Sequence, residues 1–150
     1  MQTFIGDYPC RLDAKGRVSI PSVFRKLFVK ASENRFVLRK NIYEKCLDLY
    51  PMEEWQRQLD LIRSRMNPYN RKHSEFLREF YRGTAEVEVD GNGRILIPSR
   101  LADYAGLQKE VVLAGQDGKI EIWNRDAYEK ASLTDEEFMD LANDVLGGNN

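Results

Sequence analysis

Two copies of one short motif constrain the fold of this chain more than any other feature. Residues 12–22 (LDAKGRVSIPS) return as residues 89–99 (VDGNGRILIPS), at a constant spacing of 77 residues. Each copy has an aspartate, an arginine four residues later, and a short apolar run that ends near a proline. Glycine before the arginine suits a tight turn, and proline ends a strand because it has no N–H to donate. The duplication predicts two halves that pack on each other about a local pseudo-twofold axis.

Hydrophobic periodicity predicts the elements around these motifs. Apolar residues predict strands in each repeat, one beginning at Phe4 and a half-buried one over residues 46–50. Ser22 is expected to cap a short helix over residues 23–28. Apolar residues at helical spacing predict a pair of helices between the repeats. A hydroxyl followed three residues later by a carboxylate predicts a last helix after Thr134.

These segments predict a single domain of the α+β class with a mainly β core. The 150 residues and a hydrophobic content of 42% are enough to bury one compact core. Its expected parts are a first repeat (1–50), an inserted helical hairpin (51–83), a second repeat (84–131), and an acidic C-terminal helix with its tail (132–150).

The composition argues against several classes of function. The formal charge of −1 gives the whole chain no attraction to polyanions, so any nucleic-acid site must be a local patch. Cys10 and Cys46 form no CxxC pair and His73 has no partner at metal-ligand spacing, so we expect no metal, cofactor or disulfide. No motif places a nucleophile beside a base or cradles a phosphate, so we predict that the protein is not an enzyme.

The N-terminal segment and the apolar runs bear on location. The first residues lack the basic and apolar regions of a signal peptide. No apolar run reaches the roughly 20 residues that span a bilayer. We therefore expect a cytoplasmic protein with reduced thiols and no membrane partner.

The aspartate and arginine of each motif predict a structural role. An aspartate at one end of a turn bonds the turn backbone, and an arginine at the other end can close an ion pair across it. The glycine between them supplies a positive φ. We assign this architectural role to Asp13, Gly16, Asp90, Gly93 and Arg94.

The two repeats differ in charge, although a fold needs the turn in both. Residues 11–30 hold six bases and one acid, whereas residues 88–109 hold three of each. A basic excess in one repeat of a near-neutral chain indicates a polyanion site, with a charged solvated face as the alternative. Arginine is the better base reader, because its fork matches guanine O6 and N7. The candidate DNA-binding residues are Arg17, Lys15, Arg11, Arg25 and Lys26.

Two further segments carry a charge pattern. The helical hairpin is rich in arginine, with acids that partly offset it, and we interpret it as a salt-bridged helical surface or a subunit contact. From residue 133 onward there are five acids and no base, which we interpret as a solvated helix and tail.

Both motifs resemble those of a known family. Residues 13–21 (DAKGRVSIP), with Phe24 and Arg25, resemble the first signature of MraZ, a bacterial transcriptional regulator associated with the division and cell-wall gene cluster. Residues 90–98 (DGNGRILIP) resemble its second half, and the resemblance covers about residues 1–130 in order. The second motif departs from the family at Asn92, where a basic residue is missing, and the acidic end lies outside the resemblance.

The resemblance implies properties that the residues alone do not. The fold would be a swapped-hairpin, AbrB-like barrel, formed here by two repeats of one chain. MraZ proteins form closed rings of many subunits and bind short direct repeats upstream of their own gene cluster. The DNA-contacting arginine of the family falls on Arg17, and the motif lysine falls on Lys15.

We therefore predict a sequence-specific DNA-binding transcriptional regulator that acts as a ring-shaped homo-oligomer, cytoplasmic and associated with the nucleoid. Its partners would be double-stranded promoter DNA with direct repeats and further copies of the chain. The alternative is a structural or signalling oligomer whose basic loops bind a protein partner. A steep fall of DNA affinity with salt would favour the first, because counterion release marks phosphate contact.

Overall fold

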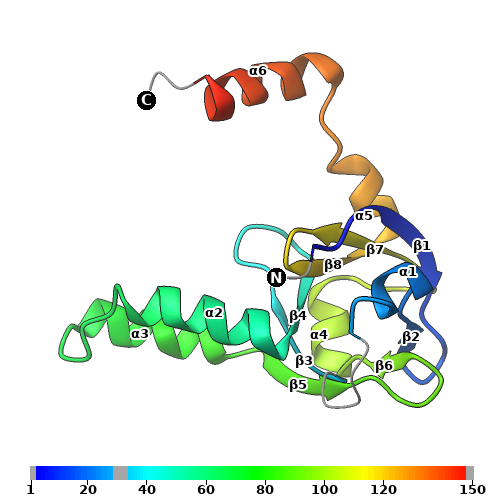
Figure 1. Ribbon diagram of the computed structural model, residues 1–150, viewed down its shortest axis with the longest axis horizontal. Helices are drawn as coiled ribbons and strands as arrows, with labels where there is room; N and C mark the ends of the chain where they lie inside the picture. The colour runs from blue at the N-terminus through cyan, green and yellow to red at the C-terminus, as the bar shows by residue number, and fades with distance from the viewer. Residues whose placement is uncertain (1–2, 29–33, 148–150) are drawn as a thin grey trace.

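The computed structural model describes residues 3–28 and 34–147, and Figure 1 shows its mixed α/β architecture. Lys30, which contributed to the charge comparison, and the end of the tail at 148–150 lie outside the described residues. A six-stranded antiparallel sheet has the order β1-β7-β8-β4-β3-β5, and β2 and β6 form a separate pair. The strands are β1 (Asp7–Arg11), β2 (Arg17–Ser19), β3 (Arg35–Lys40), β4 (Leu47–Pro51), β5 (Thr84–Glu88), β6 (Arg94–Leu96), β7 (Glu110–Gln116) and β8 (Lys119–Asn124). The helices are α1 (Ser22–Arg25), α2 (Met52–Arg63), α3 (Arg71–Tyr81), α4 (Ser99–Tyr104), α5 (Arg125–Lys130) and α6 (Asp135–Leu146).

The two repeats exchange strands. β1 and β2 of the first repeat pair with β7 and β6 of the second, and β5 of the second repeat pairs with β3 of the first. At the centre of the β2–β6 pair Val18 lies opposite Ile95, its own equivalent 77 residues later. The register is therefore symmetric under exchange of the two repeats. Among the described strands β1 and β5 are sheet edges, so the predicted closed barrel is not confirmed.

One core lies between the two repeats. Phe24 of α1 and its equivalent Leu101 of α4 are both fully buried in the same hydrophobic cluster. Phe4 and Tyr8 meet the Phe24 ring edge-on, with centroids 5.5 and 5.2 Å away. Apolar burial of this kind is the main favourable term in folding, so each half depends on the other for its core.

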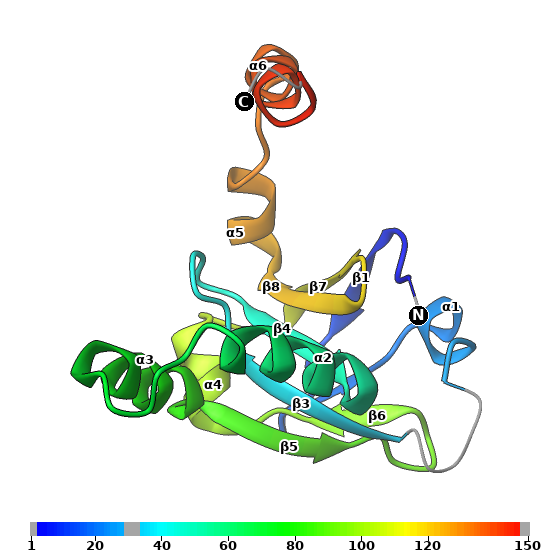
Figure 2. The ribbon, with the colours of Figure 1, turned by 60° about the vertical axis from the view of Figure 1, so that its left-hand side comes forward.

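The helical hairpin between the repeats projects from the sheet and has its own small core (Figure 2). Its root is a cluster of Val37, Trp55, Leu59 and Phe80. The rings of Trp55 and Phe80 stack with centroids 5.7 Å apart. The apolar residues at helical spacing in the sequence therefore predicted which face of the helical hairpin is packed.

The C-terminal helix α6 begins at the predicted capping box. The Thr134 hydroxyl accepts from the Glu137 N–H at 3.1 Å, and the Glu137 carboxylate accepts from the Thr134 N–H at 2.9 Å. In both ribbon views α6 stands away from the sheets, joined to them through α5 (Figures 1 and 2). No helix in the described ranges is long and apolar enough to cross a membrane.

Three local predictions are wrong. Ordered strand pairing begins at Asp7 instead of Phe4, because the Phe4 side chain turns into the core and its backbone makes only an isolated bridge. Ser22 does not cap α1, because Pro21 occupies the N-cap position and no side-chain cap bond forms. β4 is buried on both faces, since the main core covers one side and α2 packs on the other.

Candidate nucleic-acid interface

The first motif forms a loop that is held by its aspartate. One carboxylate oxygen of Asp13 accepts the backbone N–H groups of Lys15 and Arg17, both at 2.9 Å. The other accepts from Arg17 Nε at 2.9 Å. Gly16 has a φ of +87°, which an L side chain rarely adopts. Chiefly the backbone N–H of Arg17, and then its guanidinium, hold the pKa of Asp13 below its usual value.

The second motif forms the same loop. Asp90 accepts the backbone N–H groups of Asn92 at 2.8 Å and Arg94 at 3.0 Å. Arg94 Nε lies 3.3 Å from the other carboxylate oxygen, in poorer geometry, and makes no hydrogen bond to a described residue. Gly93 has a φ of +76°, and the backbone N–H of Arg94 is the main group that lowers the pKa of Asp90. The ion pair occurs in both loops, so it does not distinguish Arg17 from Arg94.

The two loops differ in whether an arginine side chain packs over the loop glycine. The guanidinium of Arg25 packs directly over Gly93, where an added Cβ would collide with its Nη1. The residue equivalent to Arg25 in the second repeat is Ala102, which cannot cover the first loop in the same way. Gly93 is accordingly buried, whereas Gly16 is half-buried against the backbone of Ile97. Sequence patterns missed this contact, which emerges only when the repeats are compared position by position in space.

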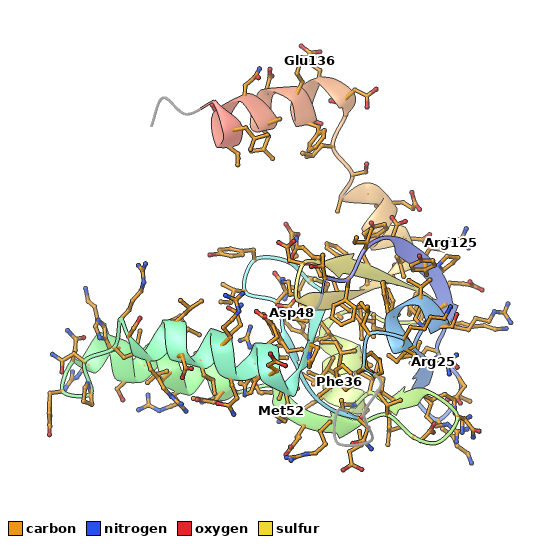
Figure 3. All side chains as sticks on the ribbon, viewed as in Figure 1. Arg25, Phe36, Asp48, Met52, Arg125 and Glu136 are labelled. Atoms are coloured by element: carbon orange, nitrogen blue, oxygen red, sulfur yellow. The ribbon has the colours of Figure 1, made fainter. Side chains whose placement is uncertain are left out.

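The five candidate DNA-binding residues are only partly brought together. Lys15 and Arg17 share the first loop, and Arg11 lies on β1 where it leads into that loop. Arg11 is exposed and forms an ion pair with Glu110 at 3.3 Å, a type of contact that contributes little in water. Arg25 lies instead at the second loop, with an exposed side chain (Figure 3). Lys26, beside it on the chain, is exposed.

Position by position, the basic character belongs to the first repeat. The equivalents of Arg11, Lys15, Arg25 and Lys26 in the second repeat are Glu88, Asn92, Ala102 and Asp103. Of the five candidates only Arg17 has a basic equivalent, Arg94. An excess of positive side chains in one repeat is the electrostatic signature of phosphate binding.

Arg17 keeps part of its hydrogen-bonding capacity. Its Nε is engaged by Asp13, but no described residue accepts a hydrogen bond from its terminal nitrogens. About 31% of its side chain is exposed. A guanidinium that is anchored at its Nε and has no described acceptor for its terminal nitrogens can recognise a phosphate or a guanine edge in a fixed orientation.

A second cluster of charged groups lies away from the loops. Cys46, Asp48 and Glu121 bring their ligand atoms within 4.8 Å of one another. Lys119 Nζ lies 2.9 Å from Asp48 and 3.5 Å from Glu121, so an ammonium already supplies the positive charge there. Burial raises the pKa of the Cys46 thiol, which opposes the thiolate that a metal needs. The cluster is therefore best described as a buried ion-pair network.

The fold and the loops together define a class of protein, in which a turn-and-strand unit is duplicated and one of its two loops is basic. The family model described as "MraZ protein, putative antitoxin-like" matches residues 3–78 and 80–146. The chain belongs to the MraZ family. It is similar to the protein named "Transcriptional regulator MraZ" from Christiangramia forsetii, with 43% identity covering 98% of this chain and 95% of the relative. Relatives of the same name from Flavobacterium psychrophilum and Bacteroides thetaiotaomicron are each 39% identical, covering 100% of this chain and 96% of their own length.

Proposed function

We propose that this protein is a DNA-binding transcriptional regulator. The relatives that match along nearly their whole length carry the name of a transcriptional regulator. The basic first loop provides a surface of the right chemistry, because most protein–DNA affinity comes from Lys and Arg on phosphates. In this proposal the protein acts on DNA in the cytoplasm, in association with the nucleoid.

The first loop reads the DNA, and the second loop is architectural. The observation that carries this assignment is that the first loop holds an exposed lysine, Lys15, beside Arg17, whose terminal nitrogens have no acceptor among the described residues. Arg17 is the base reader, and Lys15, Arg11 and Lys26 contact phosphates. Arg25, which lies over Gly93, would reach phosphate from the second loop.

The functional unit is a ring-shaped homo-oligomer on short direct repeats upstream of the division and cell-wall gene cluster. Each chain would be a single domain of two repeats, and the strand exchange between them supports the swapped-hairpin relation to AbrB-like proteins. One small loop makes few contacts, so one subunit should bind weakly. Linked loops on successive repeats raise apparent affinity by about 10² or more through effective concentration.

The test compares matched substitutions in the two loops. Fluorescence anisotropy with DNA from upstream of this protein's own gene, across a salt series, would compare the wild type with Arg17→Lys and Arg94→Lys. Lysine keeps the charge that pairs with the loop aspartate but loses the two-donor fork. Arg17→Lys should cost about 1–3 kcal/mol per site on the preferred sequence and little on scrambled DNA. Arg94→Lys should leave sequence preference unchanged.

Two results would overturn this proposal. Equal binding to cognate and scrambled DNA by the wild type would remove sequence-specific reading. An unchanged preference in Arg17→Lys would move the recognition surface elsewhere. Weak binding without a steep salt dependence would favour the other candidate, an oligomer whose basic loops bind a protein.

A further inference from the structure

The C-terminal helix α6 presents an apolar face that no described residue of its own chain covers. Phe138, Leu141 and Val145 recur at helical spacing and are 63%, 48% and 67% exposed. A helix with an apolar stripe of this kind normally buries it against another surface. Glu136 points away from the rest of the molecule (Figure 3), so the helix has distinct polar and apolar sides.

The same helix is strongly acidic. It holds Asp135, Glu136, Glu137, Asp140 and Asp144, and no base occurs from residue 133 onward. Two such helices side by side would place like charges together, which opposes a symmetric contact between α6 and α6. The face that covers α6 should therefore combine apolar and basic groups.

The helical hairpin offers that combination. A cavity of about 260 Å³ opens at its root, and its apolar lining comes from Ile42, Tyr43, Ile62, Phe76 and Phe80. Ile42 and Tyr43 are 56% and 89% exposed, an unusual state for two adjacent large side chains. Beyond the cavity, residues 61–74 at the tip of the hairpin hold four bases and no acid. We refer to this cavity and its apolar rim as the hairpin groove.

We propose that α6 of one copy of this chain docks in the hairpin groove of a second copy. Phe138, Leu141 and Val145 would fill the apolar groove, and the acidic side of α6 would face the basic tip of the hairpin. The 12 residues of the helix span about 18 Å. The two contact surfaces are different, so the contact is heterologous, and copies can follow one another head to tail until a ring closes. This inference deepens the proposed ring assembly and rests on it.

The first experiment measures the mass of the full-length protein without DNA, by light scattering or sedimentation. Phe138→Glu should reduce the assembly toward the 17.5 kDa of one chain. Asn143→Glu adds the same charge on the polar side of α6 and should leave the assembly intact. For the groove, Ile42→Glu should dissociate the assembly, whereas Ile5→Glu, the same change at an exposed position outside the groove lining and the hairpin tip, should not.

A mixing experiment separates this helix-to-groove contact from a contact of α6 with α6 or of groove with groove. A Phe138→Glu copy keeps an intact groove, and an Ile42→Glu copy keeps an intact α6. Their mixture should form particles of two chains, because the intact α6 of the Ile42→Glu copy can dock in the intact groove of the Phe138→Glu copy. A mixture that stays monomeric, an Ile42→Glu protein that still assembles, or a wild type that is itself monomeric would each overturn the proposal.

These outcomes are independent of DNA reading. If Arg17→Lys leaves sequence preference unchanged while Phe138→Glu dissociates the assembly, the docking stands and the proposed DNA-reading loop fails. If instead Phe138→Glu keeps the assembly while Arg17→Lys loses its sequence preference, the proposed DNA-reading loop stands and the docking fails. If both hold, Phe138→Glu should bind a single DNA repeat like the wild type and lose its gain of about 10² on several repeats.

Discussion

The first and second motif loops share a backbone and differ in their surroundings. In both, an aspartate accepts two backbone N–H groups and lies beside the arginine four residues later. The first loop carries Lys15 and leaves Gly16 half-buried, whereas the second carries Asn92 and has Gly93 buried beneath Arg25. The two loops share the aspartate and arginine that hold the turn, and they differ in the residues on their surface.

This difference separates architecture from recognition inside one chain. The residues that hold the turns occur in both copies, so they are explained by folding. The residues that differ between the copies are charged and exposed, and folding does not require them. Each repeat thus serves as an internal control for the other, and matched substitutions can test the comparison.

The largest effect is expected in the core beneath the loops. Phe24→Ala should lower the free energy of unfolding by about 3–5 kcal/mol, and Leu101→Ala, at the equivalent position, by about 2–5 kcal/mol. Both side chains are fully buried among residues of the two repeats in one cluster, so each variant should unfold in one transition. Urea unfolding followed by circular dichroism would measure this.

A matched control makes the first repeat resemble the second. Phe24→Leu places the residue type of the second repeat beneath the first loop and should cost much less than Phe24→Ala, because most of the volume remains. Two separate unfolding transitions in any of these variants would mean that the repeats fold independently, and the comparison would concern two domains.

Local features of the fold and the packing of the two repeats on each other were predictable from the sequence, and individual contacts between distant residues were not. The turns and their ion pairs lie within five residues of chain, so the motif predicted them. The capping box at Thr134 is local in the same way. The strand exchange and the position of Arg25 over Gly93 depend on packing between segments far apart, which periodicity does not encode. For the candidate site, charge counting predicted the basic repeat but placed Arg25 with Lys15.

The next effect concerns DNA affinity. Lys15→Asn gives the first loop the residue of the second and should weaken binding about tenfold per site, since one charge-assisted contact is lost. The slope of log affinity against log salt should fall by about 1. Anisotropy titrations at several salt concentrations would measure both.

The reciprocal change tests whether position matters. Asn92→Lys, added to Lys15→Asn, restores the net charge but places the lysine on the second loop. We expect no recovery of affinity for the preferred sequence. A full recovery would show that net charge alone governs binding, and the distinction between the loops would fail.

The effect of pH should be the same for both loops. The pKa of Asp13 and that of Asp90 are lowered in the folded state, mainly by backbone N–H groups, so the unfolded chain binds more protons near the ordinary value of 3.8. Their stabilisation is complete above that unfolded pKa and is lost as pH falls through the lowered folded values. Asp13→Asn and Asp90→Asn should each reduce the pH dependence of unfolding between about pH 2 and 5. Urea unfolding across that range would measure it, and unequal reductions would show that the aspartates are not equivalent.

The smallest expected effect concerns the Arg25 side chain, which packs over Gly93 in the second loop. Gly93→Ala meets the Arg25 guanidinium as well as an unfavourable positive φ, whereas Gly16→Ala meets backbone and the same unfavourable φ. Removing the cover with Arg25→Ala should therefore reduce the cost of Gly93→Ala by about 0.5 kcal/mol and leave that of Gly16→Ala unchanged within the error of additivity. Arg25→Ala alone should change the free energy of unfolding by less than about 0.5 kcal/mol, because its side chain is exposed. Double-mutant cycles from urea unfolding would measure both couplings. Equal couplings at the two glycines would mean that Arg25 does not distinguish the loops, and the difference between their surfaces would have to be explained by Lys15 and Asn92 alone.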